Sequence, residues 1–234
     1  MHLHINKIRE VQTVTARTRI AMVEDHRLLA ETVGLALQVE GHDVVVADLA
    51  DETTLRESVA ADASTLVLLD LDLGTLGDST RFIPHFLEAG AAVLVVTGVH
   101  DRVRLAETLE AGAVGFVVKN APFDTLLATI IRAASGEPVI EENERHQLLA
   151  ELRGHRSAER RRQAPFDALT NREREVLVEL SAGKSVETIA SEWVVSTATV
   201  RTQVRGILTK LDVNSQLAAV AKARSAGVLD GGRG

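Results

Sequence analysis

The feature that most constrains this 234-residue sequence is an unbroken apolar and β-branched run from Thr65 to Leu69, followed directly by Asp70. A run of this length and composition predicts a strand that is buried on both faces, as in the middle of a parallel sheet. Open α/β sheets bind their ligands at the carboxyl ends of the strands. We therefore expect Asp70 to lie in a binding site, as a metal ligand, as a nucleophile, or as both.

Strand and helix patterns alternate from residue 19 to residue 140. Gly41, Gly112 and Gly136 are suited to end three of the helices, and Asp101 is suited to cap another. Pro84 lies inside one predicted helix, which it would kink or delay. The predicted strands are 19–23, 42–47, 65–69, 92–96 and 114–118, and the predicted helices are 28–39, 52–61, 79–89, 101–111 and 123–134. Five such units predict an α/β fold with a five-stranded, parallel, doubly wound sheet.

Polar residues follow four of these strands. Glu24 and Asp25 come after the first strand, Asp70 after the third, Thr97 after the fourth and Lys119 after the fifth. Three carboxylates at one sheet edge repel each other and call for a cation. No His or Cys is expected among them, which favours a hard, oxygen-binding ion, Mg²⁺ or else Mn²⁺. Asp70 could then attack a phosphoryl group whose oxygens are bound by the ion, the hydroxyl and the ammonium.

Residues 19–135 resemble the receiver domain of two-component response regulators. The resemblance is carried by the acidic pair, by Leu68-Leu69-Asp70, by Thr97 and by Gly115-Phe116-Val117-Val118-Lys119. It implies a flavodoxin-like fold in which Asp70 accepts a phosphoryl group from a sensor histidine kinase. It also implies a Mg²⁺ site made by Glu24, Asp25, Asp70 and the backbone carbonyl of Asp72. The residues that bind the phosphoryl group or rearrange in response to it would be Thr97, Phe116 and Lys119.

Two departures and one rival family bear on this resemblance. Glu24 stands where an Asp is more usual, and residues 73–78 lack the Met-Pro that commonly follows the phosphoacceptor. Asp70-Leu71-Asp72 also resembles the start of haloacid-dehalogenase-type phosphatases, which are enzymes with an aspartyl nucleophile. In those enzymes the motif follows the first strand, whereas here a complete strand and an acidic pair precede it. We therefore expect a regulator rather than an enzyme.

The C-terminal part of the chain, from 167 to 229, predicts four short helices. Thr170 and Glu173 have the spacing of a capping box, and Ser185 and Ser196 are suited to cap the next two helices. The third helix, 196–211, is apolar on one side and basic or polar on the other, with no acidic residue. A tight turn followed by a helix of this kind is the helix-turn-helix pattern of DNA-binding proteins.

This part resembles the LuxR-type helix-turn-helix domain. The matching segments are Leu169 to Leu177, Ala182 to Ser185, Ile189-Ala190, Ser196 to Val200, Lys210-Leu211 and Val213. The resemblance implies that the helix 196–211 binds double-stranded DNA and that the helix 215–226 forms a homodimer. The expected DNA contacts are Ser196, Thr197, Thr199, Val200, Arg201, Thr202, Gln203, Arg205 and Lys210. Gln203 replaces a common His, which leaves the bases read at that position open.

The charge is unevenly distributed along the chain, which indicates different partners for its two parts. Residues 1–140 carry 11 Lys and Arg against 20 Asp and Glu, whereas residues 165–234 carry 9 against 8. The acidic first part is therefore a poor partner for nucleic acid. No segment is long and apolar enough to span a membrane, and Cys is absent, which fits a cytoplasmic protein.

The predicted organisation has five parts. These are an N-terminal extension (1–18), a receiver domain (19–136), a linker that could contain a helix (137–166, with the helix at 141–152), a DNA-binding domain (167–229) and a tail (230–234). The predicted function is a response regulator whose phosphorylation controls dimerisation and sequence-specific DNA binding. An orphan regulator that works without phosphorylation is the alternative.

Overall fold

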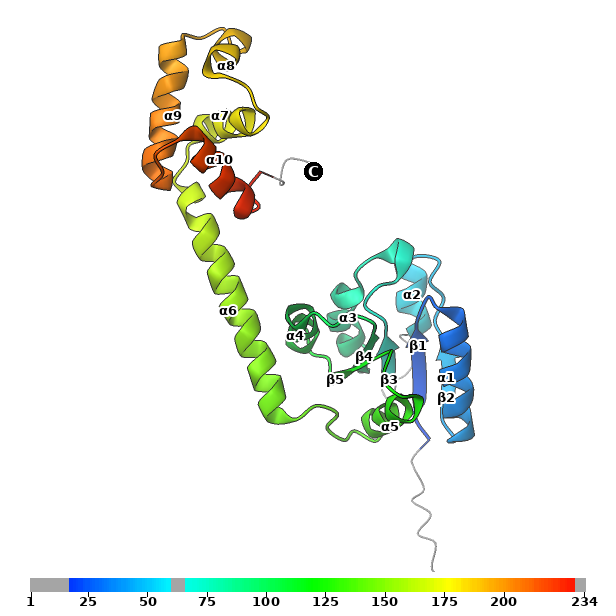
Figure 1. Cartoon of the computed structure of the whole chain (residues 1–234). Coiled ribbons are helices and arrows are strands. Elements are labelled where there is room, and N and C mark those ends of the chain that lie inside the picture. The colour runs from blue at the N-terminus through cyan, green and yellow to red at the C-terminus, as the bar shows by residue number, and fades with distance from the viewer. Residues whose placement is uncertain (1–16, 60–65, 230–234) are drawn as a thin grey trace, which may run out of the picture. The chain divides into compact units, whose positions relative to one another are not determined.

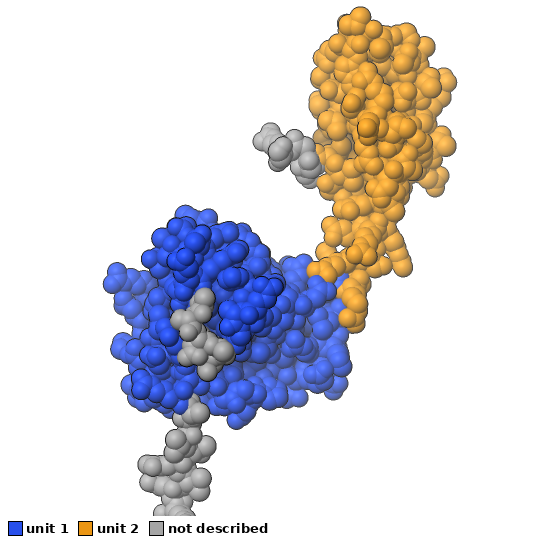
Figure 2. All heavy atoms as spheres, turned by 180° about the vertical axis from the view of Figure 1, so that it is seen from behind, with its two compact units in different colours: residues 1–152 blue, residues 153–234 orange. Residues whose placement is uncertain are grey.

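The computed structural model describes residues 17–59 and 66–229. The tail and all but the last two residues of the predicted N-terminal extension therefore lie outside the described residues. The chain forms two compact units, residues 1–152 and residues 153–234, which are coloured separately in Figure 2.

The first unit is built on a five-stranded parallel sheet with the strand order β2-β1-β3-β4-β5 (Figure 1). The strands are β1 (Arg19–Val23), β2 (Asp43–Val46), β3 (Leu66–Leu69), β4 (Ala92–Thr97) and β5 (Gly115–Val118). Every residue of β3 is buried, as its apolar run predicted. Since β1 pairs with β2 on one side and β3 on the other, the strand order changes direction at β1, which is where such sheets bind ligands.

Helices cover both faces of the sheet. They are α1 (Arg27–Val39), α2 (Glu52–Val59), α3 (Ile83–Glu88), α4 (Arg102–Glu110) and α5 (Phe123–Ala134). Alternate strand residues point to opposite faces, so Val67 and Leu69 join one apolar core with α2 and α3, while Leu66 and Leu68 join another with α1 and α5. The predicted doubly wound α/β fold is confirmed.

Pro84 determines where the third helix begins. The predicted helix 79–89 is divided into a 3₁₀ turn, η2 (Ser79–Phe82), and α3. Pro84 lies in the first turn of α3, where its missing N–H group costs nothing because that group would have no helical partner. A second 3₁₀ turn, η1 (Gly74–Leu76), lies in the loop after β3.

The second unit is helical. Its helices are α7 (Asn171–Ser181), α8 (Val186–Glu192), α9 (Thr197–Leu211) and α10 (Gln216–Ser225). The predicted capping box of Thr170 and Glu173 is present, and Ser185 and Ser196 accept hydrogen bonds from backbone N–H groups as predicted. Apolar side chains of all four helices meet in one core, which includes Val176, Ile189, Ile207 and Ala219.

A 26-residue helix, α6 (Glu142–Asp167), begins in the first unit and ends in the second. We predicted a helix only as far as Leu152 and an irregular charged linker from Gly154 onward. The structure instead continues the helix to Asp167, because the segment is rich in Glu, Arg, Ala and Gln, which favour helix. Pro165 lies in its last turn.

Candidate functional site

The carboxyl edge of the sheet holds an open pocket that contains most of the residues predicted for phosphorylation. It is lined by Asp25, His26, Asp70, Asp72, Gly74, Thr97, Gly98, Val99 and Lys119. Glu24 is buried next to it and contacts Lys119. Phe116 does not line the pocket; it packs against the apolar clusters around β3 and α4. The topology thus brings together residues that are far apart in the sequence, because each follows a strand end at the same sheet edge.

Lys119 is the centre of the charged network in this pocket. Its Nζ atom lies 2.6 Å from Asp70 Oδ2 and 2.7 Å from the Glu24 carboxylate. Asp70 is 4% exposed and Glu24 is 7% exposed. Partial burial by itself would lower the pKa of the Lys119 ammonium, but the hydrogen bonds and charges of Asp70 and Glu24 outweigh it and raise that pKa above its usual value. Lys119 therefore keeps its charge.

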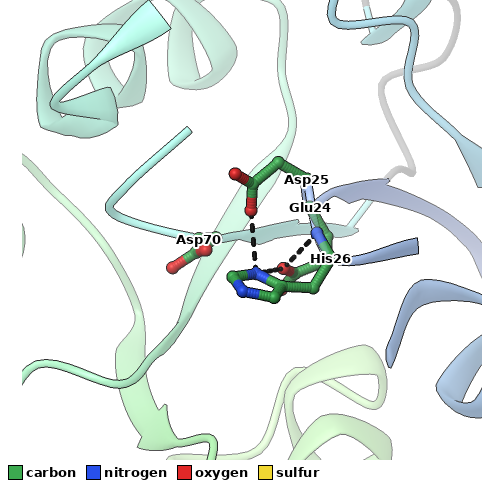
Figure 3. Close-up of side chains that lie close together, drawn as sticks. All are labelled: Glu24, Asp25, His26 and Asp70. Atoms are coloured by element: carbon green, nitrogen blue, oxygen red, sulfur yellow. Dashed lines mark hydrogen bonds and ion pairs between the residues drawn. The ribbon is translucent and has the colours of Figure 1, made fainter. Parts of the chain in front are cut away.

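His26 belongs to the same cluster, contrary to our expectation that no His would join the acidic residues. Its Nδ1 atom lies 3.0 Å from Glu24 Oε1 and 2.9 Å from Asp25 Oδ1 (Figure 3). Its backbone N–H also donates to Glu24 Oε1, at 2.9 Å. Spacing rules for metal ligands gave no warning, but the position of His26 directly after Asp25 at the end of β1 was a signal that could have found it.

The donor set of the pocket fits a divalent cation. One ligand atom from each of Glu24, Asp25, His26 and Asp70 can be chosen such that all lie within 4.8 Å of one another. Three of the four are carboxylate oxygens, which hard ions such as Mg²⁺ prefer. The fourth is an imidazole nitrogen, which Mg²⁺ does not select and which here contacts the carboxylates of Glu24 and Asp25, directly after β1. The carboxylates are thus the part of the cluster that suits Mg²⁺.

Thr97 and the loop after Asp70 are both held by hydrogen bonds next to the pocket. Thr97 is fully buried, and its Oγ1 accepts a hydrogen bond from the Val99 backbone N–H at 3.0 Å. In the loop after β3, the buried Ser79 hydroxyl donates to the Asp70 carbonyl. Leu73 N–H donates to the Gly77 carbonyl at 3.1 Å, which closes the segment that lacks Met-Pro. The loop after β3, residues 71–79, is therefore held partly by bonds within the loop and to Asp70.

In the second unit, α9 presents most of the predicted DNA contacts on its surface. Ser196, Thr199, Arg201, Thr202 and Arg205 are exposed, and Thr197 and Gln203 are partly exposed. The Arg201 guanidinium bonds to the exposed Glu187 carboxylate at 2.9 Å. Such an exposed ion pair contributes little to stability, so a phosphate could replace the carboxylate.

Two residues of the predicted set are used inside the unit. Val200 is 1% exposed and packs in the core, so we no longer include it among the DNA contacts. Lys210 Nζ bonds to Glu173 Oε2 at 2.7 Å, and its charge is therefore already paired. The helical spacing that put Val200 in the core was readable from the sequence, whereas the partner of Lys210 was not.

Glu173 is the buried acid of the second unit, at 5% exposure. It accepts hydrogen bonds from Lys210 and from the Thr170 backbone N–H, both at 2.7 Å. Burial by itself would raise the pKa of this carboxyl group, but the bonds from Lys210 and Thr170 outweigh it and lower the pKa below its usual value. Sequence reasoning recognised Glu173 only as a capping residue and missed its ion pair.

Comparisons with known proteins agree with both halves of this description. Residues 20–131 match the response regulator receiver domain, and residues 167–223 match the bacterial regulatory proteins of the luxR family. The chain is 30% identical over 216 residues to the "Probable transcriptional regulatory protein NarL" of Mycobacterium tuberculosis, which covers 92% of this chain and 97% of that protein. The chain is a LuxR-type response regulator. As such it belongs to a two-component system and binds DNA to regulate transcription.

Other relatives of this LuxR-type regulator align over nearly their whole length. The "Nitrate/nitrite response regulator protein homolog" of Haemophilus influenzae is 28% identical over 204 residues, which is 87% of this chain and 94% of that protein. NarP of Escherichia coli is 30% identical over 202 residues, 86% of this chain and 92% of that protein. Within residues 17–59 and 66–229, no helix of the regulator combines the length and apolar character that crossing a membrane requires.

Proposed function

We propose that a sensor histidine kinase phosphorylates Asp70 and that the phosphoryl group switches the dimerisation and DNA binding of this regulator. The observation that carries the proposal is the position of Asp70. It ends a fully buried strand and opens into a pocket where Lys119 Nζ lies 2.6 Å from Asp70 Oδ2. A carboxylate placed in this way is oriented for attack and is accompanied by a cation that can bind the incoming oxygens.

The transfer is an exchange of one phosphorus bond for another. An oxygen of the Asp70 carboxylate attacks the phosphorus of a phosphohistidine, a P–O bond forms, the P–N bond breaks, and the departing imidazole takes up a proton. Mg²⁺ held by Glu24, Asp25, Asp70 and the Asp72 carbonyl would neutralise charge on the phosphoryl oxygens. Lys119 contributes its ammonium to the same oxygens, and the pKa of Lys119 ensures that this group is charged.

Thr97 and Phe116 would report the new group to the rest of the receiver. Thr97 Oγ1 accepts a hydrogen bond from the Val99 N–H group, and its hydroxyl hydrogen can donate to a phosphoryl oxygen. Phe116 is partly exposed and packs on two apolar clusters, so it can respond to a change at Thr97 on the neighbouring strand β4. We assign the regulator this switching role and no catalytic turnover of its own.

DNA binding would use α9 in the major groove. Ser196, Thr197, Thr199, Thr202 and Gln203 can contact bases or phosphates, while Arg201 and Arg205 supply the positive charge. Lys210 would reach a phosphate only by leaving Glu173. Dimerisation through α10, where Leu217 is 79% exposed, would place two copies of α9 about one helical turn of DNA apart.

The domain boundaries and the cytoplasmic location that the sequence predicts are part of the same proposal. We propose a receiver at 19–136 and a DNA-binding domain at 167–229, joined by residues 137–166. Both the phosphodonor domain of the kinase and the chromosome would be met in the cytoplasm. Residues 1–18 and 230–234 have no role in this proposal.

The test is intact mass after incubation with acetyl phosphate and Mg²⁺, with Asp70→Asn as the control. We expect one phosphoryl adduct on the wild type and none on the variant, together with tighter DNA binding by the phosphorylated form. A wild type that takes up no phosphoryl group but still binds DNA would overturn the proposal in favour of a regulator that works without phosphorylation. Continuous release of phosphate over many turnovers would instead identify a phosphatase.

A further inference from the structure

The helix α4 contacts two different parts of the receiver through two arginines. Arg104 Nη2 donates to the Leu71 carbonyl at 3.1 Å, and Arg104 Nε donates to Asp78 Oδ2 at 3.2 Å. Arg102 forms a bidentate pair with Glu151 of α6, at 2.8 and 3.0 Å. The helix α4 thus contacts the loop 71–79 through Arg104 and the first half of α6 through Arg102.

The first half of α6, residues 142–152, is docked on α4 by apolar packing as well. Leu148 and Leu152 are fully buried, and they meet Ala106 and Leu109 of α4 in one cluster. Phe116 of β5 is partly buried against the same cluster. Two fully buried leucine side chains remove far more apolar surface from water than the exposed ion pair of Arg102 does, so this packing dominates the docking.

A third arginine fixes the docking at the carboxyl end of α4. Arg145 of α6 donates to the carbonyl of Leu109 at 3.3 Å and to that of Ala113 at 3.3 Å. Carbonyls at the end of a helix have no partner in the helix itself, and a guanidinium satisfies them well. This segment of α6 is therefore an integral part of the receiver surface.

The bonds of Arg104 depend on a segment in which this chain departs from the receiver pattern. Asp78 ends the segment 73–78, which lacks Met-Pro. Its other carboxylate oxygen accepts a hydrogen bond from Thr80 N–H at 2.8 Å, so Asp78 is oriented toward Arg104. The same loop contains Asp72, the carbonyl of which is a proposed Mg²⁺ ligand. A change at the phosphorylation site can therefore reach α4 directly through this loop.

We propose that α4 couples the phosphorylation site to α6, so that phosphorylation of Asp70 weakens the docking of residues 142–152. This inference rests on the proposed function. Two contacts next to the pocket bear on α4. Thr97 accepts a hydrogen bond from the Val99 N–H group in the connection that leads into α4, so a movement of Thr97 toward a phosphoryl group would displace this connection, and Phe116 belongs to the cluster that holds Leu148 and Leu152. Because α6 continues unbroken to Asp167, the released segment is covalently continuous with the DNA-binding unit.

The experiment is hydrogen–deuterium exchange of the full chain, with and without acetyl phosphate and Mg²⁺, with the adduct measured by intact mass in each sample. In the wild type we expect phosphorylation to speed exchange within 142–152 by about two- to fivefold, with no change in the core helices of the second unit. Glu151→Gln should speed exchange by a similar factor without phosphorylation. Glu142→Gln is the matched control, because Glu142 pairs with His146 of its own helix, and it should change exchange little.

Arg104→Gln tests the route from the loop to α4. We expect this variant to accept the phosphoryl group but to show less than about half of the wild-type increase in exchange. A complete adduct on the wild type with unchanged exchange at 142–152 would overturn the coupling and leave the proposed function intact. An increase in Arg104→Gln as large as in the wild type would overturn the role of Arg104. Absence of any adduct on the wild type would overturn the proposed function and the coupling with it.

Discussion

Each unit of this regulator contains one lysine bound to a buried carboxylate, and the two networks differ in their balance of charge. In the receiver, Lys119 bonds to Asp70 and Glu24, with Asp25 close by. In the DNA-binding unit, Lys210 bonds to Glu173 alone, and the Lys210 ammonium and the Thr170 backbone N–H both donate to Glu173 Oε2. The first network has more negative than positive charge and opens into a pocket, whereas the second pairs one positive with one negative charge.

The difference in charge balance distinguishes a candidate binding site, around Lys119, from a structural ion pair, between Lys210 and Glu173. An excess of carboxylates around one ammonium leaves negative charge that a bound cation would balance, and such imbalance is typical of functional sites. A single ion pair has no such excess, and removing its cation leaves a buried carboxylate unpaired, which destabilises the fold. We therefore expect changes at Lys119 to affect chemistry and changes at Lys210 to affect folding.

The same substitution at both lysines should affect the two networks in different ways, and this is the largest difference that we expect. Lys119→Met should lower the rate of phosphorylation by acetyl phosphate about 100-fold, because a charged group at the reacting oxygens is lost. Lys210→Met should leave that rate unchanged and lower the free energy of unfolding of the second unit by about 2–3 kcal/mol, because Glu173 stays buried without its cation. Stopped reactions analysed by intact mass, and urea unfolding, measure the two effects. An equal loss of stability in both variants, with equal rates, would contradict the distinction.

The close packing around Glu173 can be tested at Gly206. A Cβ atom at this position would overlap Oε1 of the buried Glu173 carboxylate, whose Oε2 is held by hydrogen bonds from Lys210 and from the Thr170 backbone N–H. Gly206→Ala should therefore lower the free energy of unfolding by about 2 kcal/mol, although alanine favours helix.

Gly154 provides the matched control for this substitution. It also lies in a helix, and a Cβ atom there would meet nothing within 4 Å. Gly154→Ala should stabilise the protein by about 0.5–1 kcal/mol. If both alanine variants gained stability, the carboxylate of Glu173 would not be fixed as described.

The lowered pKa of Glu173 predicts how the second unit responds to acid. A carboxyl group with a pKa below its usual 4.5 in the folded state adds stability that is complete above that pH and is lost as the pH falls through the lowered value. Glu173→Gln should be less stable than the wild type at pH 7 by about 1–2 kcal/mol, and the difference should shrink below about pH 4.5. Thermal unfolding between pH 7 and pH 3 measures it, and a difference that stays constant over this range would be evidence against an ionised Glu173.

The smallest expected effect concerns backbone strain in the turn between α8 and α9. Val194 has a φ angle of 55° and is 91% exposed, so a β-branched residue adopts a left-handed conformation without gaining any packing. Val194→Asn should stabilise the second unit by about 0.5–1 kcal/mol, since asparagine tolerates this conformation. Val39→Asn, at a similarly exposed valine of a right-handed helix, should give no gain in thermal unfolding.

The sequence predicted the elements of both units well because their signals are local. The buried run before Asp70, the glycines after the helices and the capping serines all act within a few residues of their own position. Pro84 even indicated that α3 would start late. The main error was in α6, where Gly154 and Pro165 suggested a linker, although neither is enough to interrupt a helix of such composition.

The doubly wound sheet, the helix-turn-helix pattern and the polar residues at the strand ends could all be predicted from the sequence, because chain order and periodicity fix which residues share an edge. Which side chains meet became visible only in the folded protein. It paired Lys210 with Glu173 and gave α4 its bonds to the loop 71–79 and to α6. These contacts join residues that are distant in the sequence, and their partners depend on packing distances that no local pattern encodes. His26 is different, because it follows Asp25 directly and only its closeness to Asp70 depended on the fold.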